Sequence, residues 1–333
     1  MSDQTYDVVG IGNAIVDVIC HVDDGFVDEH TLQKGAMTLI DEDRAHQLYA
    51  AMPPGIEASG GSAANTIAGI GSFGGKVAYI GKVRDDQLGE VFRHDIRAIG
   101  VDYDVPLGAE GPATARCLIV VTPDAERTMN TFLGISNLLE PSDVDESVVS
   151  RAKIVYCEGY LWDVESAKEA MLKGMRTAKA AGGRTSLTLS DTFCVDRHRT
   201  EFHDLIENDI DILFGNHGEL TALYETEDLD AAIAEVEKRV DIAAITCGPK
   251  GSIVVGHGER HEIPAWTVEG RVLDTTGAGD LYASGFLHGI TRGRDLATCA
   301  RLGHLAAGEV ISHLGPRPEV SLSELATQVL KLD

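Results

Sequence analysis

The stretch VLDTTGAGDLYASGFL, residues 272–287, carries the most specific chemical pattern in the chain. Gly277, Ala278 and Gly279 leave their backbone N–H groups almost uncovered, and the apolar residues that follow recur at helical spacing. A helix N-terminus has unpaired amides, so this turn is suited to hold an anion. Asp280 follows directly, and its negative charge is tolerated there if a hydroxyl lies between it and the anion. That hydroxyl would transfer its proton to Asp280 while its oxygen attacks a phosphoryl group held by the amides.

The same turn is also an ordinary helix start, because a carboxylate in the first turn interacts favourably with the helix dipole. The flanking residues Asp274, Thr275 and Thr276 favour the catalytic interpretation. They complete the motif DTTGAGD, which resembles the carboxy-proximal motif of the ribokinase-like, or PfkB, family of sugar and nucleoside kinases. The resemblance extends from near residue 6 to near residue 318. It implies ATP-dependent transfer of the γ-phosphoryl group to a primary hydroxyl, with Asp280 as the base.

Residues 10–17, GIGNAIVD, follow the first expected strand. Asn13 and Asp17 offer an amide and a carboxylate at the mouth of a parallel sheet, where open α/β folds bind ligands. A carboxylate there accepts strong hydrogen bonds from vicinal sugar hydroxyls. A dinucleotide fingerprint is disfavoured, because Ile15 stands where its third glycine is needed. A solvated turn is the plain alternative, but the segment resembles the family's GN…D element, which implies acceptor binding.

A second acceptor-binding element is expected in GGSAANT. Gly60 and Gly61 permit a close backbone approach, and Asn65 lies one helical turn further on, on the face that begins at Gly61. Together with Ser62 they resemble the amino-proximal motif of the family, which implies contacts with the acceptor hydroxyls.

The nucleotide side is expected at the ends of later strands. Asn216 and Glu219, in GNHGEL, share a helix face at i and i+3, which is typical of a capping box. They also resemble the family's NxxE element, which implies Mg²⁺ held through water, and the two interpretations are compatible. The segment ITCGPKGS resembles the family's nucleotide-binding loop, and its expected site residues are Thr246, Gly248, Lys250 and Gly251. For Lys250, contact with phosphate and a solvated surface position are equal alternatives.

Three further expectations rest on single residues. His304 and Ala307, with Gly308 and Ile311, share a helix face that could pack against adenine, although a lone histidine is more often structural. Arg127 is the first candidate for an arginine that reaches over the phosphates, with a surface role as its alternative, and Arg116 is a weaker candidate. The resemblance also implies a monovalent cation such as K⁺ at Asp274 and Thr276, with carbonyls near Gly315.

The acceptor is predicted from the opening of the chain. The order and spacing of GNAIVDV, GFVDEHTLQKGAMTLIDED and GGSAANT resemble adenosine kinases more than ribokinases. Apolar side chains expected to face the site, and suited to stack on a flat base, are Ile15, Met37, Leu118 and Tyr160. Adenosine is therefore the first choice, ahead of ribose, fructose or a keto-sugar acid. The competing classes are a non-catalytic binding module of the same fold, which has no need for Asp280, and a dinucleotide-dependent oxidoreductase.

The elements that position these residues alternate between strand-like and helical runs. This pattern predicts one α/β domain over residues 1–333, with a mostly parallel central sheet sandwiched by helices. Between 101 and 132, the strand-like pieces VDYDVPLG, TARCLIVVT and RTMNTFL follow one another without a helix. With segments near 14–22 and 35–40 they are expected to form a small projecting sheet, either a lid on a monomer or a dimer contact. Val272 and Leu273 are expected to close a strand.

Composition limits the partners of this chain. The net charge of −25 over 333 residues disfavours nucleic acids and anionic membranes, which leaves a small molecule as the partner. The six cysteines are scattered singly, without metal-ligand spacing, so reduced thiols are expected. The start, MSDQTYDVVGIG, has no basic segment before an apolar one. A cytoplasmic protein is expected.

Overall fold

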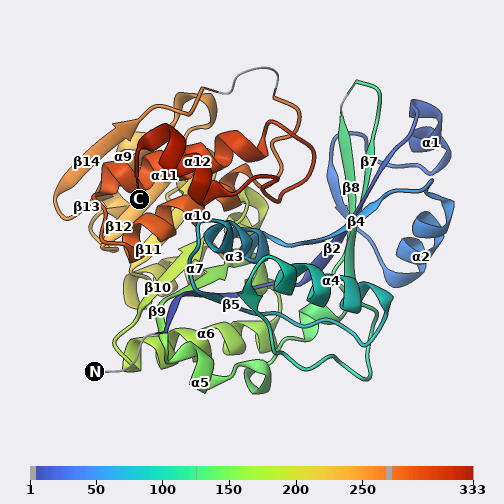
Figure 1. The fold of residues 1–333 in the computed structure, drawn as a ribbon, viewed down its shortest axis with the longest axis horizontal. Helices are drawn as coiled ribbons and strands as arrows, with labels where there is room; N and C mark the ends of the chain where they lie inside the picture. Colours follow the sequence, from blue (N-terminus) through green and yellow to red (C-terminus); the bar gives the residue numbers. More distant parts are fainter. Residues whose placement is uncertain (1–4, 125, 268–271, 333) are drawn as a thin grey trace.

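The computed structural model describes residues 5–124, 126–267 and 272–332, and it arranges them around two sheets (Figure 1). The larger sheet has a long parallel part, and the strands at one end are antiparallel. Its strands, in spatial order, are β14 (Glu259–Ile263), β13 (Ser252–Gly256), β12 (Ile242–Thr246), β11 (Ile212–Asn216), β10 (Arg184–Thr188), β9 (Ala152–Glu158), β1 (Tyr6–Ile11), β5 (Val77–Ile80) and β6 (Val101–Asp102).

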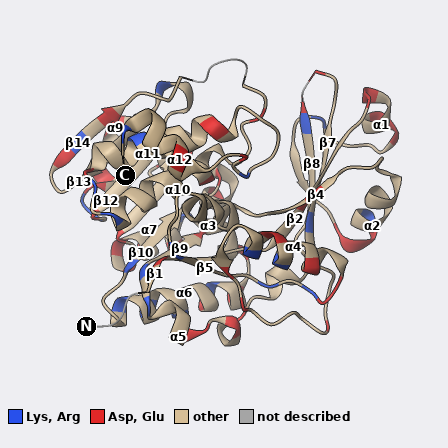
Figure 2. Ribbon diagram, viewed as in Figure 1, with Lys and Arg blue, Asp and Glu red and all other residues tan. Residues whose placement is uncertain are grey.

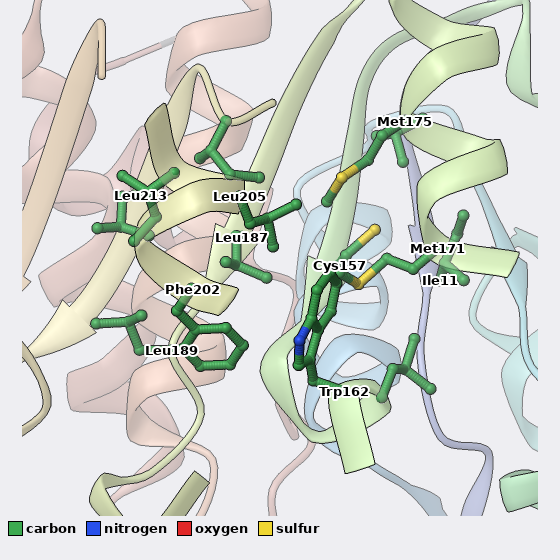
Figure 3. Close-up of a cluster of buried hydrophobic side chains, with 14 of the residues drawn as sticks. Ile11, Cys157, Trp162, Met171, Met175, Leu187, Leu189, Phe202, Leu205 and Leu213 are labelled. Carbon is green, nitrogen blue, oxygen red and sulfur yellow. The ribbon is translucent and has the colours of Figure 1, made fainter. Parts of the chain in front are cut away.

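Helices cover both faces of this sheet, because its central strands are apolar on both sides. One face packs against α6 (Glu165–Ala180), α7 (Thr192–Asn208), α8 (His217–Leu223) and α9 (Leu229–Val236). Figure 3 shows part of this core, where Met171 and Met175 lie near Ile11 and Cys157. The opposite face packs against α3 (Ser62–Ser72), α4 (Gln87–Ala98), α10 (Ala278–Thr291) and α11 (Leu296–Val310). The α/β class predicted from the alternation is confirmed.

The smaller sheet projects from this body, on the right in Figure 1. Its order is β3 (Met37–Leu39), β8 (Arg127–Phe132), β7 (Ala115–Val121), β2 (Ile15–His21) and β4 (Ile56–Gly60). The helices α1 (Asp24–Glu29) and α2 (Glu42–Ala51) pack against one face, where Val27 and Leu48 contribute to the apolar clusters. The sequence did not predict β4, because IEASG combines a short length with small residues.

The projecting sheet contains less of the 101–132 segment than expected. The piece at 101–108 contributes β6 to the large sheet, where Val101 pairs in parallel with Val77 of β5. The prediction that this piece joins the small sheet is wrong. The reason is that α4 connects β5 to β6 as a regular crossover, so the βαβ alternation continues for one more unit.

Val272 and Leu273 belong to no strand. They are 47% and 43% exposed, and the Leu273 amide donates to the Ile311 carbonyl at the end of α11. The predicted strand is therefore wrong at these two residues, which lie against a helix end instead of a strand. Its earlier part, at 268–271, lies outside the described residues.

Other features agree with the composition. The six cysteines are free thiols. Acidic residues occur on the body and on the projecting part alike (Figure 2). Within the described ranges, no helix combines the length and apolarity that crossing a membrane requires. The elements that were not predicted include α5 (Glu146–Val149), the 3₁₀ turn at Gly159–Asp163, and α12 (Leu322–Leu330).

Candidate active site

Asp280 lies in the first turn of α10, half-buried, and α3 holds its carboxylate at both oxygens. The Ser62 hydroxyl donates to Oδ1 at 2.7 Å, and Asn65 Nδ2 donates to Oδ2 at 2.9 Å. Thr66 Oγ1 donates to the Asp280 carbonyl at 3.1 Å. The two predicted motifs, whose bonded residues are 215 and 218 positions apart, therefore meet at one carboxylate, which is fixed in orientation and only half-buried.

The turn before Asp280 has the conformation that its glycines allow. Gly277 is the N-cap of α10 with φ 77°, and a Cβ there would lie 2.8 Å from the Cβ of Pro316. A Cβ at Gly279 would meet no atom within 4 Å, so this side of the turn is open. The Ala278 amide donates to the Thr275 carbonyl at 3.2 Å, which corrects the expectation that all three amides are bare. The Gly277 and Gly279 amides meet no acceptor in the described part of the chain.

Glu158, which sequence reasoning missed, organises the acceptor side. It ends β9 at 1% exposure and accepts from both nitrogens of Asn13 and from the Ala63 amide, each at 2.8 Å. Burial raises its pKa to about 7, although these bonds lower it. A signal was present: a single carboxylate that ends an apolar strand, at the edge where parallel sheets bind ligands. Gly12 is required beside it, since a Cβ there would lie 2.6 Å from Glu158 Oε2.

Several of the predicted acceptor residues are buried next to one another or next to the site carboxylates. Asn13 and Asp17 are 3% and 7% exposed, and a Cβ at Gly60 would lie 2.4 Å from Asp17 Oδ2. Burial raises the pKa of Asp17 to about 6, opposed by Arg317 and Arg127. Asn13 Oδ1 and Asn65 Oδ1 are buried and have no hydrogen-bond donor among the described residues. A buried acceptor without a donor costs about 1–3 kcal/mol, so a ligand that brings hydroxyl groups is favoured here.

Arg127 reaches from β8 of the projecting sheet to the residues before the anion turn. Its Nη1 forms an ion pair with the buried Asp274 and donates to Thr276 Oγ1 at 2.9 Å. Asp274 also accepts from the Thr276 and Gly315 amides. Nε and Nη2 of Arg127 are buried without an acceptor in the part of the chain that the structure describes. The surface alternative for Arg127 is therefore wrong.

The expected apolar residues do not all lie on one face. Strand register places Met37 beside Met129, and Asp17 beside Cys117 and Ala58, on the face of the small sheet that carries Arg127. Ile15 alternates with Asp17 onto this face. Leu118 points the opposite way, into the core shared with Leu48 of α2. The expectation that Leu118 faces the site is wrong, because a strand changes face at every residue.

Tyr160 lies beyond the strand in which it was expected. It occupies the 3₁₀ turn Gly159–Asp163, half-buried, and its amide donates to Ser190 Oγ at 3.3 Å. Desolvation raises its pKa, and the charges of Asp191, Asp280 and Glu158 raise it further. Tyr160 therefore interacts with the acidic groups of the site, but it does so from the turn that follows β9 and not from the strand itself.

Arg116 lies on the face of the small sheet opposite to Arg127. It is 5% exposed on β7, and its guanidinium lies 5.9 Å from the Tyr49 ring and 5.7 Å from the Phe132 ring. It packs under α2, on the face that Leu118 shares, so its weaker candidacy as a phosphate ligand is not supported.

Four of the residues predicted to bind nucleotide line a cavity of about 770 Å³ at the ends of β11 and β12. Its walls include Asn216, Thr246, Gly248 and Lys250, and the Lys250 side chain is exposed. Gly251 closes the loop with φ 103°, and a Cβ there would lie 2.0 Å from the Ile263 carbonyl oxygen. A smaller cavity of about 90 Å³ is lined by residues that include Asp280, Ser62, Asn216 and Thr246, so Asp280 and the ends of β11 and β12 face one space.

Comparisons with known proteins identify the family. A model of the pfkB family of carbohydrate kinases matches residues 56–321. The chain belongs to this family. A 5-dehydro-2-deoxygluconokinase from Halalkalibacterium halodurans is 26% identical over 322 residues, which cover 93% of this chain and 90% of that protein. The predicted resemblance is confirmed.

Two solved structures are similar over nearly their whole length. The adenosine kinase from Sinorhizobium meliloti is 53% identical with a TM-score of 0.91, covering 97% of this chain and 99% of that chain. A probable sugar kinase from Rhizobium etli is 49% identical with a TM-score of 0.92, covering 99% and 100%. The fold of this pfkB kinase is therefore that of these two proteins.

The pfkB kinase has one pair of residues that fits Mg²⁺ through water. The Asn216 side chain accepts from the Glu219 amide at 2.9 Å, and Glu219 accepts from the Asn216 amide at 2.9 Å, so the predicted capping box is confirmed. Glu219 is 5% exposed, and desolvation raises its pKa to about 7. Both of its oxygens bond Asn216, so direct metal ligation would break the cap. Water-mediated contact with Mg²⁺ fits this donor set and stays a prediction.

The expected monovalent cation meets a different situation. The Arg127 guanidinium already neutralises Asp274, whose two oxygens also accept the Thr276 and Gly315 amides. A cation bound to this carboxylate would have to displace Arg127. The donor set in this arrangement does not fit K⁺.

The predicted adenine face is partly covered by the protein itself. His304 is 7% exposed, its Nε2 lies 2.9 Å from Ser252 Oγ, and burial lowers its pKa to about 4. Trp266 packs on Gly308, where a Cβ would lie 2.7 Å from ring atom Cδ1. The expectation that Gly308 is free for adenine is wrong. His304 and Trp266 instead line one cavity of about 410 Å³ next to the nucleotide loop, on the side of α11 that includes Ala307.

Proposed function

We propose that this pfkB kinase transfers the γ-phosphoryl group of ATP to the primary hydroxyl of adenosine, with Asp280 as the general base. The observation that carries the proposal is the position of the Asp280 carboxylate, between the acceptor residues of α3 and the cavity of the nucleotide loop. The alternative of a non-catalytic binding module gives no reason to hold a carboxylate at this point.

The residues of the chain divide the work as follows. Ser62 and Asn65 orient the Asp280 carboxylate so that it receives the proton of the acceptor hydroxyl. The Gly277 and Gly279 amides and the dipole of α10 stabilise the charge on the transferred group. Mg²⁺, when bound, neutralises phosphate charge, and Asn216 and Glu219 would hold its waters. Because phosphoryl transfer is largely dissociative, positioning is the main requirement.

A neutral acceptor is favoured over a sugar acid by the charges around the site. The carboxylates of Asp17 and Glu158 both interact electrostatically with Asp280, so the proposed acceptor site is surrounded by acidic groups. The nearby cations already have partners, since Nη1 of Arg127 pairs with Asp274 and Arg317 bonds backbone carbonyls, and only Nε and Nη2 of Arg127 lack an acceptor among the described residues. A carboxylate on the acceptor would be repelled, whereas ribose hydroxyls satisfy the two unpaired asparagine oxygens. The likeness to the Sinorhizobium meliloti adenosine kinase supports the same choice.

The test is ADP formation from MgATP with a panel of acceptors: adenosine, ribose, fructose and 5-dehydro-2-deoxygluconate. We expect kcat/KM for adenosine to exceed that for each of the others by at least about 10²-fold. A site that forms hydrogen bonds to particular groups of its substrate discriminates strongly against compounds that lack them. Asp17→Asn serves as the control, because it removes one negative charge and one acceptor of hydroxyl groups. This variant should have a lower kcat/KM for adenosine, and the ratio of kcat/KM for adenosine to that for the sugar acid should fall. Preference of the wild type for the sugar acid would contradict the assignment.

The activity should depend on pH through Asp280. Desolvation raises its pKa to about 6, although Asn65, Ser62 and Arg317 lower it. Only the ionised carboxylate accepts a proton, so kcat should fall about tenfold per pH unit below pH 6. The measurement is kcat at saturating adenosine and MgATP between pH 4.5 and 8.5, chosen as roughly the span around this pKa. An acid limb near the ordinary aspartate value would show that Asp280 is not the group that titrates.

A further inference from the structure

Three consecutive residues after α11 each contact a different part of the site. The Gly315 amide donates to Asp274 Oδ2 at 3.0 Å, and Asp274 is the partner of Arg127 from the projecting sheet. Pro316 packs against Gly277, the N-cap of α10. The segment 315–317 therefore touches the anion turn and, through Asp274, the arm that reaches from the small sheet.

Arg317 makes the third contact, across the junction of β4 and α3. Its Nε donates to the Ser59 carbonyl at 2.9 Å, its Nη1 to the Ala64 carbonyl at 2.7 Å, and its Nη2 to Ser59 Oγ at 3.2 Å. These two carbonyls lie on either side of Gly60 and Gly61. A single guanidinium thus fixes the end of β4 relative to the first turn of α3, from which Ser62 and Asn65 hold Asp280.

The positive charge of Arg317 also lies among acidic groups. It acts on the Asp17 and Asp280 carboxylates and lowers the pKa of each. Burial lowers the pKa of Arg317 itself to about 10, opposed by the same carboxylates, so the guanidinium stays protonated at neutral pH. The other titratable groups that interact with Asp280 are Asp17, Tyr156, Glu158, Tyr160 and Glu219.

We propose that Arg317 is a positioning residue for Asp280: it fixes the β4–α3 junction that orients this carboxylate, and it holds a positive charge beside the acidic groups of the site. Arg317 acts without touching the acceptor. The inference rests on the proposed function in so far as Asp280 is the base. Charge and geometry can be separated, because lysine keeps the charge but cannot make the same forked contacts.

The first test compares the pH profiles of Arg317→Met and Arg317→Lys with that of the wild type. Without the charge, the acid limb of kcat should move up by about one pH unit, as expected for the loss of a nearby opposite charge. Arg317→Met should therefore lose about fivefold more activity at pH 6 than at pH 8, and at pH 8 it should show the lower kcat expected of any variant without the forked contacts. Arg317→Lys should keep the limb and show a lower kcat at all pH values. A limb that does not move in Arg317→Met would overturn the proposal.

A matched control is Arg97→Met. Arg97 also donates through two nitrogens to a backbone carbonyl, that of Tyr103, but it does not act on Asp280. It should lose stability without a change in the acid limb. Thermal unfolding of all variants shows whether they fold. If Arg317→Met does not fold, Arg317→Lys carries the test: a wild-type kcat in that variant would contradict the need for the forked contacts.

A second readout does not require turnover. The ¹³C signals of aspartate carboxyl carbons report the titration of Asp280, which is assigned as the signal missing from Asp280→Asn. The midpoint should rise in Arg317→Met and stay unchanged in Arg97→Met. An unchanged midpoint in Arg317→Met contradicts the role of Arg317 but does not contradict the proposed function. A shifted midpoint in a protein that phosphorylates none of the acceptors contradicts the proposed function and supports the role of Arg317.

Discussion

Asp280→Asn should lower kcat by about 10³-fold, within the range that general bases contribute. The amide cannot accept the proton of the acceptor hydroxyl, while the backbone amides of the turn and the nucleotide cavity stay in place. KM for adenosine and for MgATP should change by only a few fold. The measurement is steady-state ADP formation, combined with calorimetric binding of adenosine to the variant.

Stability separates this loss from unfolding. Desolvation raises the pKa of Asp280 in the folded state, so the folded protein binds this proton more tightly than the unfolded chain does. The free energy of unfolding therefore falls as pH rises from about 4 to about 6, and the full destabilisation by the charged carboxylate is present above that window. Removing the charge should leave the melting temperature at pH 8 equal to or above that of the wild type. Asp295→Asn, which alters the N-cap of α11 instead, is the control with normal turnover. Activity of Asp280→Asn close to the wild type would refute the base.

Gly277→Ala is the second change with a large expected effect. Gly277 has φ 77°, and the added Cβ would lie 2.8 Å from Pro316, so the turn must shift. Displacement of a donor from the position of the developing charge costs about 10²–10³-fold in kcat in comparable sites. We expect a loss of about 10²-fold in kcat with a smaller change in KM for MgATP.

Gly293→Ala provides the matched control for backbone strain. Gly293 has φ 69°, and a Cβ there would meet no atom within 4 Å. It follows the same helix, α10, at its other end. Both variants should lose about 1 kcal/mol of stability, because alanine is strained at positive φ. Only Gly277→Ala should lose turnover. Equal kinetics of the two variants would mean that the turn does not act on the transferred group.

The motifs of this kinase could be predicted because they depend on local chemistry. A Gly-Ala-Gly turn before Asp280, and the Gly60–Gly61 pair before Ser62 and Asn65, need particular residue types at fixed spacing. The family and the α/β fold class followed from these motifs and from the alternation of strands and helices, and both are confirmed. The roles assigned to the single residues stay predictions.

The errors lie where long-range pairing decides the outcome. The run at 101–108 was expected in the projecting sheet together with the strand-like pieces that follow it. Its first residues instead pair in parallel with β5, at the edge of the large sheet. Leu118 was assigned to the site because it is apolar, and only the register shows that it belongs to the other face of β7. Val272 and Leu273 have the apolar composition of a strand, but the Leu273 amide donates to the Ile311 carbonyl at the end of α11 instead of to a neighbouring strand.

By itself, the sequence determined which residue types stand at the anion turn, at the base and at the nucleotide loop, because short segments encode turns, caps and helices. Only the tertiary structure decided what surrounds them: Glu158 beneath Asn13 and Ala63, Arg127 on Asp274, and Arg317 across the β4–α3 junction. These partners are 95 to 253 residues apart in the chain. No local pattern specifies such pairs, since they form only when the packed core brings the chain segments together.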